Sequence, residues 1–186
     1  CGLPYMLVFS TLSAWLRDAG AALTVIGFIS WAALTYSLKF LWSPFVDRIK
    51  MPLNQVVGQR RSWILMMQLL ILILIMMMSQ FDPISSLNFI VITAVLIAFF
   101  GSLQDIAVDA YRIELVSLDE QGNLAASYQF GYRLSILVAT SLALIFADFV
   151  SWQTVYSMLS FFMLIGVLGA LIGNTPETLK VDYGYV

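Results

Sequence analysis

The stretch FIVITAVLIAFFGSLQDIAVDAYRIELV, residues 89–116, begins as a membrane span and ends as a charged helix. Residues 89–103 carry no charge, and no turn residue separates them from the polar residues that follow: Gln104, Asp105, Asp109, Arg112 and Glu114. Asp105 and Asp109 are four residues apart, so a helix presents both on one face. A charge near mid-bilayer costs about 2.5–3.5 kcal/mol on insertion scales, and such groups face other helices or water. We therefore predict a functional site at these two carboxylates.

A simpler interpretation is that the charged end protrudes into water as a solvated, self-paired helix. The stretch is longer than the roughly 20 residues that a span needs, and this alternative stays open for Arg112 and Glu114. It fits Asp105 poorly, because Asp105 lies ~20 Å from Leu118 at 1.5 Å of helix rise per residue.

The composition indicates an integral membrane protein whose main partner is the lipid bilayer. Of 186 residues, 61% are hydrophobic and 11% are charged, whereas soluble domains carry about 25% charged residues. The net charge of −2 predicts no nucleic-acid partner. The chain has no histidine and one cysteine, Cys1, so we expect no metal site, no cofactor and no enzymatic activity. A lipidated N-terminal Cys1 is an alternative that several apolar segments in succession make less attractive.

Apolar segments alternate with short polar loops along the whole chain. They cover residues 1–16, 22–42, 62–79, 86–116, 122–147 and 152–173. We therefore predict an all-α, polytopic bundle of six helices over residues 1–174. The first segment is too short to span and no initiator Met precedes it, so we expect it to be truncated. Residues 62–79, nearly pure Leu, Ile and Met, are expected to face lipid, and Pro44 is expected to end the second helix.

The charge of the loops predicts the orientation. Residues 47–61 hold Arg48, Lys50, Arg60 and Arg61, whereas the turns at residues 81–83 and 151–152 hold no Lys or Arg. By the positive-inside rule the 47–61 loop lies in the cytoplasm. Residues 117–121 and the C-terminal tail then lie on the same side.

The segment 122–147 carries polar residues at the depth of the two aspartates. Arg133 lies ~16 Å past Gly122, and the segment runs antiparallel to residues 86–116 after a short loop. An unpaired Arg at that depth would be costly, so we predict an ion pair between Arg133 and Asp105 or Asp109. Lys39, near the end of the second segment, either extends to the interface or points into a cavity.

The loop after the second segment resembles a known signature. Asp47-Arg48, followed by Gly58-Gln59-Arg60-Arg61, is similar to the cytoplasmic loop pattern G-x-x-x-D-R-x-G-R-R of the major facilitator superfamily. Ser43 replaces the first glycine of that pattern, and additional residues separate Arg48 from Gly58. By this resemblance Asp47, Arg48, Arg60 and Arg61 are gating residues; the alternative for Asp47 is a helix cap with a solvated charge.

A wider set of short motifs resembles the AmpG-type muropeptide permeases of this superfamily. The motifs are GLP at 2–4, AWL at 14–16, T-x-I-G at 24–27, KFLWSP at 39–44, RR-x-W at 60–63, QDI-x-x-DA at 104–110, EQG at 120–122 and GYRL at 131–134. They follow the family order from Gly2 to about Trp152. Gln59 stands where the family usually has Arg. Acetyl-coenzyme A transporters share a related QDIAVD motif.

The resemblance implies a twelve-helix protein of the bacterial inner membrane that imports anhydro-muropeptides, driven by protons. This chain would be its N-terminal half, with residues 175–186 as the start of a cytoplasmic linker to a missing C-terminal half. Asp105 and Asp109 would couple protons. The expected substrate-binding residues are Arg133, Gln104, Gln129, Tyr128, Tyr132, Lys39 and Trp15. The aromatic residues among them either stack on sugar rings or serve packing.

Two other functions remain open from the sequence. An acetyl-coenzyme A type carrier would need more buried Arg or Lys for its phosphates than this chain offers. A non-transporting membrane subunit, including a six-helix half acting as a homodimer, is the second alternative.

Overall fold

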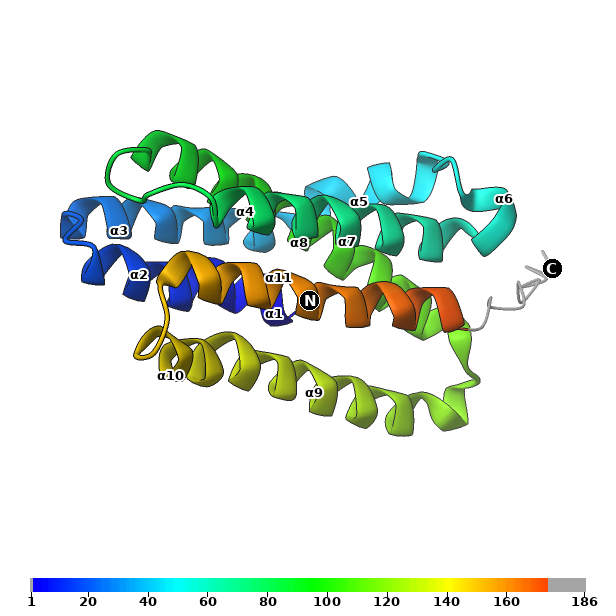
Figure 1. The fold of residues 1–186 in the computed structure, drawn as a ribbon. Helices are drawn as coiled ribbons and strands as arrows, with labels where there is room; N and C mark the ends of the chain where they lie inside the picture. The colour runs from blue at the N-terminus through cyan, green and yellow to red at the C-terminus, as the bar shows by residue number, and fades with distance from the viewer. Residues whose placement is uncertain (1, 174–186) are drawn as a thin grey trace, which may run out of the picture.

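The structure, a computed structural model, describes residues 2–173, and every regular element in that range is helical. Short elements join end to end into long segments that run up and down the bundle (Figure 1). These segments overlap the six predicted apolar segments, although the second continues to Arg48 instead of ending at residue 42. The predicted linker at residues 175–186 lies outside the described residues.

The first segment joins α1 (Gly2–Met6), a π-helical turn η1 (Leu7–Thr11) and α2 (Leu12–Asp18). Leu7, Leu12 and Leu16 are fully buried in the main core. The segment ends at Gly20, whose φ of 86° lies in the left-handed region that glycine adopts without steric cost. This turn reverses the chain into the second segment.

The second segment is broken where the sequence predicts one helix. It consists of α3 (Leu23–Ile29), a 3₁₀ turn η2 (Ser30–Ala32), α4 (Ala33–Ser37) and α5 (Lys39–Arg48). Leu38, with φ −91° and ψ 11°, separates α4 from α5. The predicted stop at Pro44 is wrong, because α5 continues through it to Arg48. Beyond the proline, Val46 of α5 is buried and packs in a second core cluster that includes Trp63.

The centre of the bundle is α7 (Gln59–Met78), which follows the short α6 (Asn54–Val57). It packs against α8 (Leu87–Leu115) and α11 (Trp152–Ile172). Its buried residues include Ile71, Ile75 and Met78, all with no exposed surface. Another side of the helix is exposed and apolar, with Leu69, Ile73 and Met77 at 42%, 51% and 44% exposure. The prediction that this segment faces lipid therefore fits that side alone, whereas the rest of the helix packs in the bundle. An apolar surface on all sides suits a protein core as well as lipid, so the sequence alone could not separate the two.

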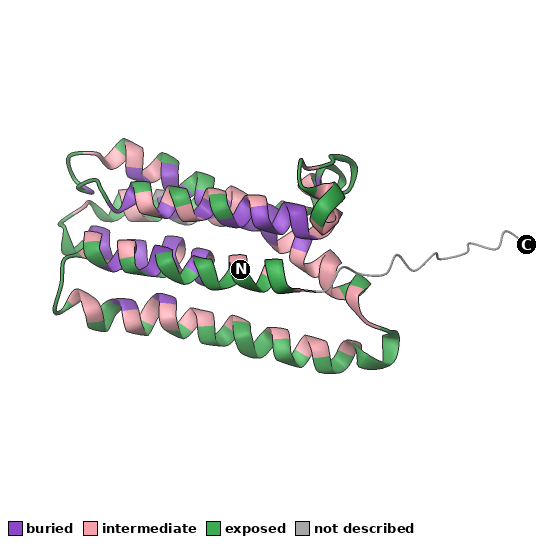
Figure 2. Ribbon diagram, turned by 45° about the vertical axis from the view of Figure 1, so that its right-hand side comes forward, coloured by how far each residue is buried: buried purple, intermediate pink, exposed green. Residues whose placement is uncertain are grey.

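The fifth segment lies at the edge of the bundle. It contains η3 (Leu118–Glu120), α9 (Gln121–Leu137), η4 (Val138–Leu142) and α10 (Ala143–Ala147). No residue of α9 is buried, and its ribbon is exposed or half-buried along its whole length (Figure 2). Four helical stretches are long and apolar enough to cross a membrane: Gln59–Met78, Leu87–Leu115, Leu118–Ala147 and Trp152–Ile172.

The loops gather at two opposite ends of the bundle. The α5–α6–α7 connection, the α8–α9 connection and the end of α11 lie at one end, and the α2–α3, α7–α8 and α10–α11 turns lie at the other (Figure 1). This arrangement places the basic loop and residues 116–121 at the same end. That this end of the bundle faces the cytoplasm remains a prediction from the charge of the loops.

Candidate functional site

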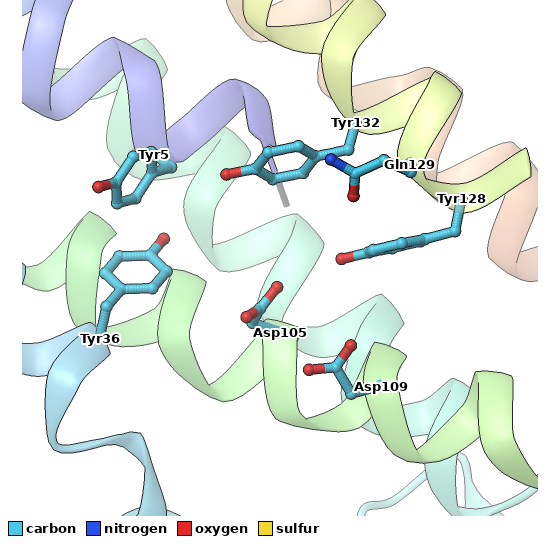
Figure 3. A pocket seen from close by; sticks show the side chains of 7 residues that line it. All are labelled: Tyr5, Tyr36, Asp105, Asp109, Tyr128, Gln129 and Tyr132. Carbon is cyan, nitrogen blue, oxygen red and sulfur yellow. The ribbon is translucent and has the colours of Figure 1, made fainter. Parts of the chain in front are cut away.

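A pocket of about 390 Å³ opens between the first, second, fourth and fifth helical segments. Its lining combines four tyrosines with two carboxylates and one amide: Tyr5, Tyr36, Asp105, Asp109, Tyr128, Gln129 and Tyr132 (Figure 3). Asp105 and Asp109 share the pocket-facing side of α8, as their four-residue spacing predicts.

Lys39 provides the positive charge opposite these carboxylates. Its Nζ lies 3.1 Å from Asp105 Oδ2 and 3.4 Å from Asp109 Oδ2. The Lys39 side chain is 41% exposed, whereas that of Asp105 is 19% exposed. Lys39 is the first residue of α5, directly after the break at Leu38. Lys39 thus points toward the two carboxylates that line the pocket, although it is not itself part of the lining.

Asp109 has a second cation on its other oxygen. Arg112 NH2 lies 3.9 Å from Asp109 Oδ1, and the Arg112 guanidinium carbon lies 4.9 Å from the centre of the Tyr128 ring. A guanidinium over an aromatic face is an attractive cation–π arrangement. Arg112 thus pairs within α8, as the self-paired alternative expects, and it also contacts the aromatic lining on α9.

The aromatic side of the pocket includes residues that sequence reasoning missed. The Tyr5 and Tyr36 rings meet edge to face at 5.0 Å, and Tyr5 also lies 4.7 Å from Phe9. Tyr128 and Tyr132 lie one helical turn apart on α9 with nearly parallel rings 6.4 Å apart. Tyr5 and Tyr36 sit among apolar residues, so no charge pattern marks them; the proximity of Tyr36 to Lys39 in sequence was the available indication.

The predicted ion pair of Arg133 with an aspartate is wrong for the described part of the chain, where Asp105 and Asp109 pair with Lys39 and Arg112. Arg133 is exposed and does not line the pocket. It lies about 100° around α9 from Tyr132, which faces the pocket. The sequence argument matched the depth of Arg133 in the bundle but left its direction around the helix undetermined.

Trp15 and Gln104 belong to the core instead of the pocket lining. Trp15 is 2% exposed, and its ring lies 4.8 Å from that of Tyr156. Gln104 is also 2% exposed, and its amide donates to Gln68 Oε1. Gln68 in turn donates to the carbonyl of Met163 at 2.7 Å, so this amide chain joins α8, α7 and α11. The structure thus favours packing for Trp15 and an interhelical link for Gln104.

Two of the four predicted gating residues, Asp47 and Arg60, belong to a separate cluster at the end of the bundle that carries the basic loop. Arg60 NH1 lies 2.5 Å from Asp47 Oδ1, and Arg60 NH2 lies 2.8 Å from Glu114 Oε1. One guanidinium therefore joins the end of α5, the start of α7 and the end of α8. Glu114 completes this cluster, although the sequence analysis did not assign it to gating.

Arg61 and Arg48 lie apart from that ion-pair cluster. Arg61 donates from Nε to the carbonyl of Ala170 at 2.8 Å and from NH2 to the carbonyl of Leu171 at 2.7 Å. These bonds satisfy two of the carbonyls that the end of a helix leaves free, and they fix α11 to the start of α7. Arg48 is exposed at the end of α5.

Comparison with known proteins assigns this arrangement to a family. Residues 1–183 match the model of the Major Facilitator Superfamily. The chain belongs to the major facilitator superfamily. Together with four helices of membrane-spanning length, this membership makes it a multi-pass protein of the bacterial inner membrane.

Individual relatives agree with this assignment. The chain is 37% identical to the anhydromuropeptide permease of Escherichia coli K12 over 97% of its own length, which is 36% of that protein. It is 33% identical to a Rickettsia conorii protein named as an AmpG 4 transporter, over 96% of this chain and 44% of that protein. The chain thus spans less than half the length of these relatives. Within residues 2–173, no group of three or more His, Cys, Asp or Glu side chains is placed to hold a metal ion.

Proposed function

We propose that the protein imports anhydro-muropeptides, GlcNAc-anhydro-MurNAc and its peptides, together with protons across the inner membrane. The observation that carries this proposal is the pocket in which a tyrosine lining meets the Lys39–Asp105–Asp109 cluster. The name of the E. coli relative, anhydromuropeptide permease, supports the substrate class.

The pocket has the size and chemistry for one part of such a ligand. Its volume of about 390 Å³ falls within the roughly 300–1,000 Å³ of small-molecule sites. Tyrosine rings offer a large apolar face for a sugar ring and a hydroxyl for its polar groups. Transporters built from repeats bind their substrate at the repeat interface, so a second helical bundle would supply the other side of the site.

The charge balance of the cluster supports coupling to protons. Lys39 and Arg112 carry two positive charges, and Asp105 and Asp109 carry two negative charges, so the four groups together are neutral. Adding one proton to an aspartate leaves one positive charge in excess. Lys39, attracted less strongly to a neutral carboxyl group, can then bind the lactyl or peptide carboxylate of the substrate. A proton and an anionic substrate therefore enter together.

An acetyl-coenzyme A type carrier fits this pocket less well. Its substrate carries several phosphates, which proteins bind with clustered Arg and Lys. Within residues 2–173 the pocket lining contains two carboxylates and no arginine, so it lacks the clustered cations that several phosphates require.

The decisive experiment is uptake by the full-length protein in proteoliposomes with an imposed pH gradient. We expect labelled GlcNAc-anhydro-MurNAc to accumulate above equilibrium, and a protonophore to abolish the accumulation. Absence of saturable uptake would contradict the substrate assignment, and accumulation that ignores the gradient would contradict proton coupling.

A further inference from the structure

The Tyr36 hydroxyl is a buried polar group of the pocket without a partner. Its oxygen makes no hydrogen bond within residues 2–173. The Tyr36 ring extends from α4 into the pocket, where its hydroxyl end lies near Tyr5 and Asp105 (Figure 3). Buried polar groups nearly always have a hydrogen-bond partner, and leaving one unpaired is costly. The hydroxyl is therefore placed for a partner that comes from outside the described chain.

A glycine on the facing helix makes room for this hydroxyl. A methyl group added at Gly101 of α8 would overlap the Tyr36 hydroxyl oxygen and lie 3.3 Å from ring carbon Cζ. Gly101 has helical geometry and a negative φ, so its backbone does not require glycine. The need at this position is space, and the atom that occupies the space is the Tyr36 oxygen.

Tyr36 and Lys39 act on the same face of α8. Tyr36 lies over Gly101, and Lys39 pairs with Asp105, which is four residues further along α8. Tyr36 lies in the last turn of α4, two residues before the break at Leu38, and Lys39 begins α5 after it. One broken helical segment therefore places a neutral donor in the pocket lining and a positively charged donor on the carboxylates that line the same pocket.

We propose that Tyr36 is a specificity-determining residue, whose hydroxyl donates a hydrogen bond to an uncharged oxygen of the transported ligand. A sugar hydroxyl or an acetamido carbonyl has the required chemistry. Lys39 then takes the carboxylate of the same ligand. Gly101 is a positioning residue that leaves room for the Tyr36 hydroxyl against α8. This inference rests on the proposed function, because it identifies a hydrogen bond by which that same pocket recognises its sugar ligand.

The test compares equilibrium binding of GlcNAc-anhydro-MurNAc to purified full-length variants by calorimetry. We expect Tyr36→Phe to raise the Kd about tenfold, as loss of one hydrogen bond predicts. The melting temperature without ligand should not fall, because the variant removes a buried hydroxyl that has no partner within residues 2–173. Gly101→Ala should raise the Kd further, because it displaces the whole ring. In Tyr36→Phe/Gly101→Ala the overlapping oxygen is gone, so the Kd should return to that of Tyr36→Phe alone. Gly131→Ala is the matched control, since nothing lies within 4 Å of the added methyl group.

Three other outcomes overturn the inference or part of it. Unchanged binding by Tyr36→Phe, with binding by the wild type intact, would show that the hydroxyl does not read the ligand. Normal binding with loss of gradient-driven accumulation would assign the hydroxyl to proton transfer instead. Multiplicative effects in the double variant would refute the link between Gly101 and Tyr36. Failure of the wild-type protein to bind would instead contradict the proposed function, and if Gly101→Ala does not fold, Tyr36→Phe alone decides.

Discussion

Lys39 and Asp105 are 66 residues apart in the chain, yet the ammonium and the carboxylate lie 3.1 Å apart in the pocket. This contact joins the broken second segment to the long helix α8. The sequence predicts that Arg133 pairs with an aspartate, whereas the structure pairs Lys39 with both aspartates and Arg112 with Asp109. This difference has a direct consequence for mutagenesis.

Lys39→Met should abolish gradient-driven uptake, because it leaves two neighbouring carboxylates without their shared cation. Arg112 alone then cannot balance both carboxylates, and no ammonium remains to bind the carboxylate of the substrate. Uptake by proteoliposomes under a pH gradient measures the effect, and we expect a loss of at least about a hundredfold, the size of a close charge pair.

Arg133→Gln is the matched control for Lys39→Met. Arg133 is exposed and pairs with neither aspartate, so uptake should stay within about twofold of the wild type. A severe defect in Arg133→Gln together with a mild one in Lys39→Met would reverse the assignment of the two cations.

Trp15→Ala should destabilise the protein without a direct effect on ligand binding. Trp15 is packed against Tyr156, whose hydroxyl donates to the Leu7 carbonyl at 2.9 Å. Truncation of a buried aromatic residue costs about 3–5 kcal/mol. We expect a clearly lower melting temperature in detergent, and a Kd for GlcNAc-anhydro-MurNAc near that of the wild type wherever the variant is folded. A raised Kd at unchanged stability would restore the sugar-stacking role.

Asp47→Asn should slow transport with little change in substrate affinity. The Asp47 side chain is 51% exposed, so its pair with Arg60 contributes at most about 1 kcal/mol to stability. Its position at the end of α5, bound through Arg60 to α8, suits control of a conformational change. Initial uptake rates at several substrate concentrations separate the two effects. An affinity loss with an unchanged maximum rate would point to a binding role.

The orientation of the bundle can be tested with single cysteines after Cys1→Ser. The positive-inside rule places Asn54 in the cytoplasm and Asp82 outside, and the structure puts these two residues at opposite ends of the bundle. In intact cells an impermeant thiol reagent should label Asp82→Cys and spare Asn54→Cys. The reverse pattern would refute the predicted topology.

Periodicity and charge predicted the helical segments and the shared face of Asp105 and Asp109, because these follow from local geometry along one helix. The partner of the aspartates depends on the rotation of each helix about its own axis, and sequence spacing does not give that rotation between different helices. Arg133 was misplaced for this reason. Trp15 was misplaced because an aromatic residue suits a core, an interface and a sugar site equally well.

The breaks in the helices also could not be predicted from the sequence. The segment around Leu38 reads as one continuous apolar helix, and no glycine or proline marks the break that separates Tyr36 from Lys39. Tertiary contacts with α8 decide the local geometry there. In the same way, Pro44 predicts a helix end from local chemistry. The helix α5 instead continues to Arg48, and Val46 beyond the proline packs in the second core cluster.

The last prediction separates proton coupling from a static ion pair. If Asp109 carries the proton, Asp109→Asn mimics its neutral state permanently. Gradient-driven accumulation should then be lost, whereas exchange of substrate at equal concentrations on both sides should persist, since exchange needs no change in protonation. If the Lys39 cluster only fixes the second segment against α8, the defect of Asp109→Asn arises from an unbalanced charge.

In that static case Asp109→Asn/Lys39→Gln should recover accumulation, because it leaves a neutral amide pair beside the Asp105 and Arg112 charges, which balance each other. Under coupling the double variant stays inactive, because both the proton carrier and the cation that it releases are gone. Folding of each variant is checked by its melting temperature, so that loss of the protein is not mistaken for loss of coupling. Recovery of gradient-driven uptake in the double variant would refute the coupling role of Asp109.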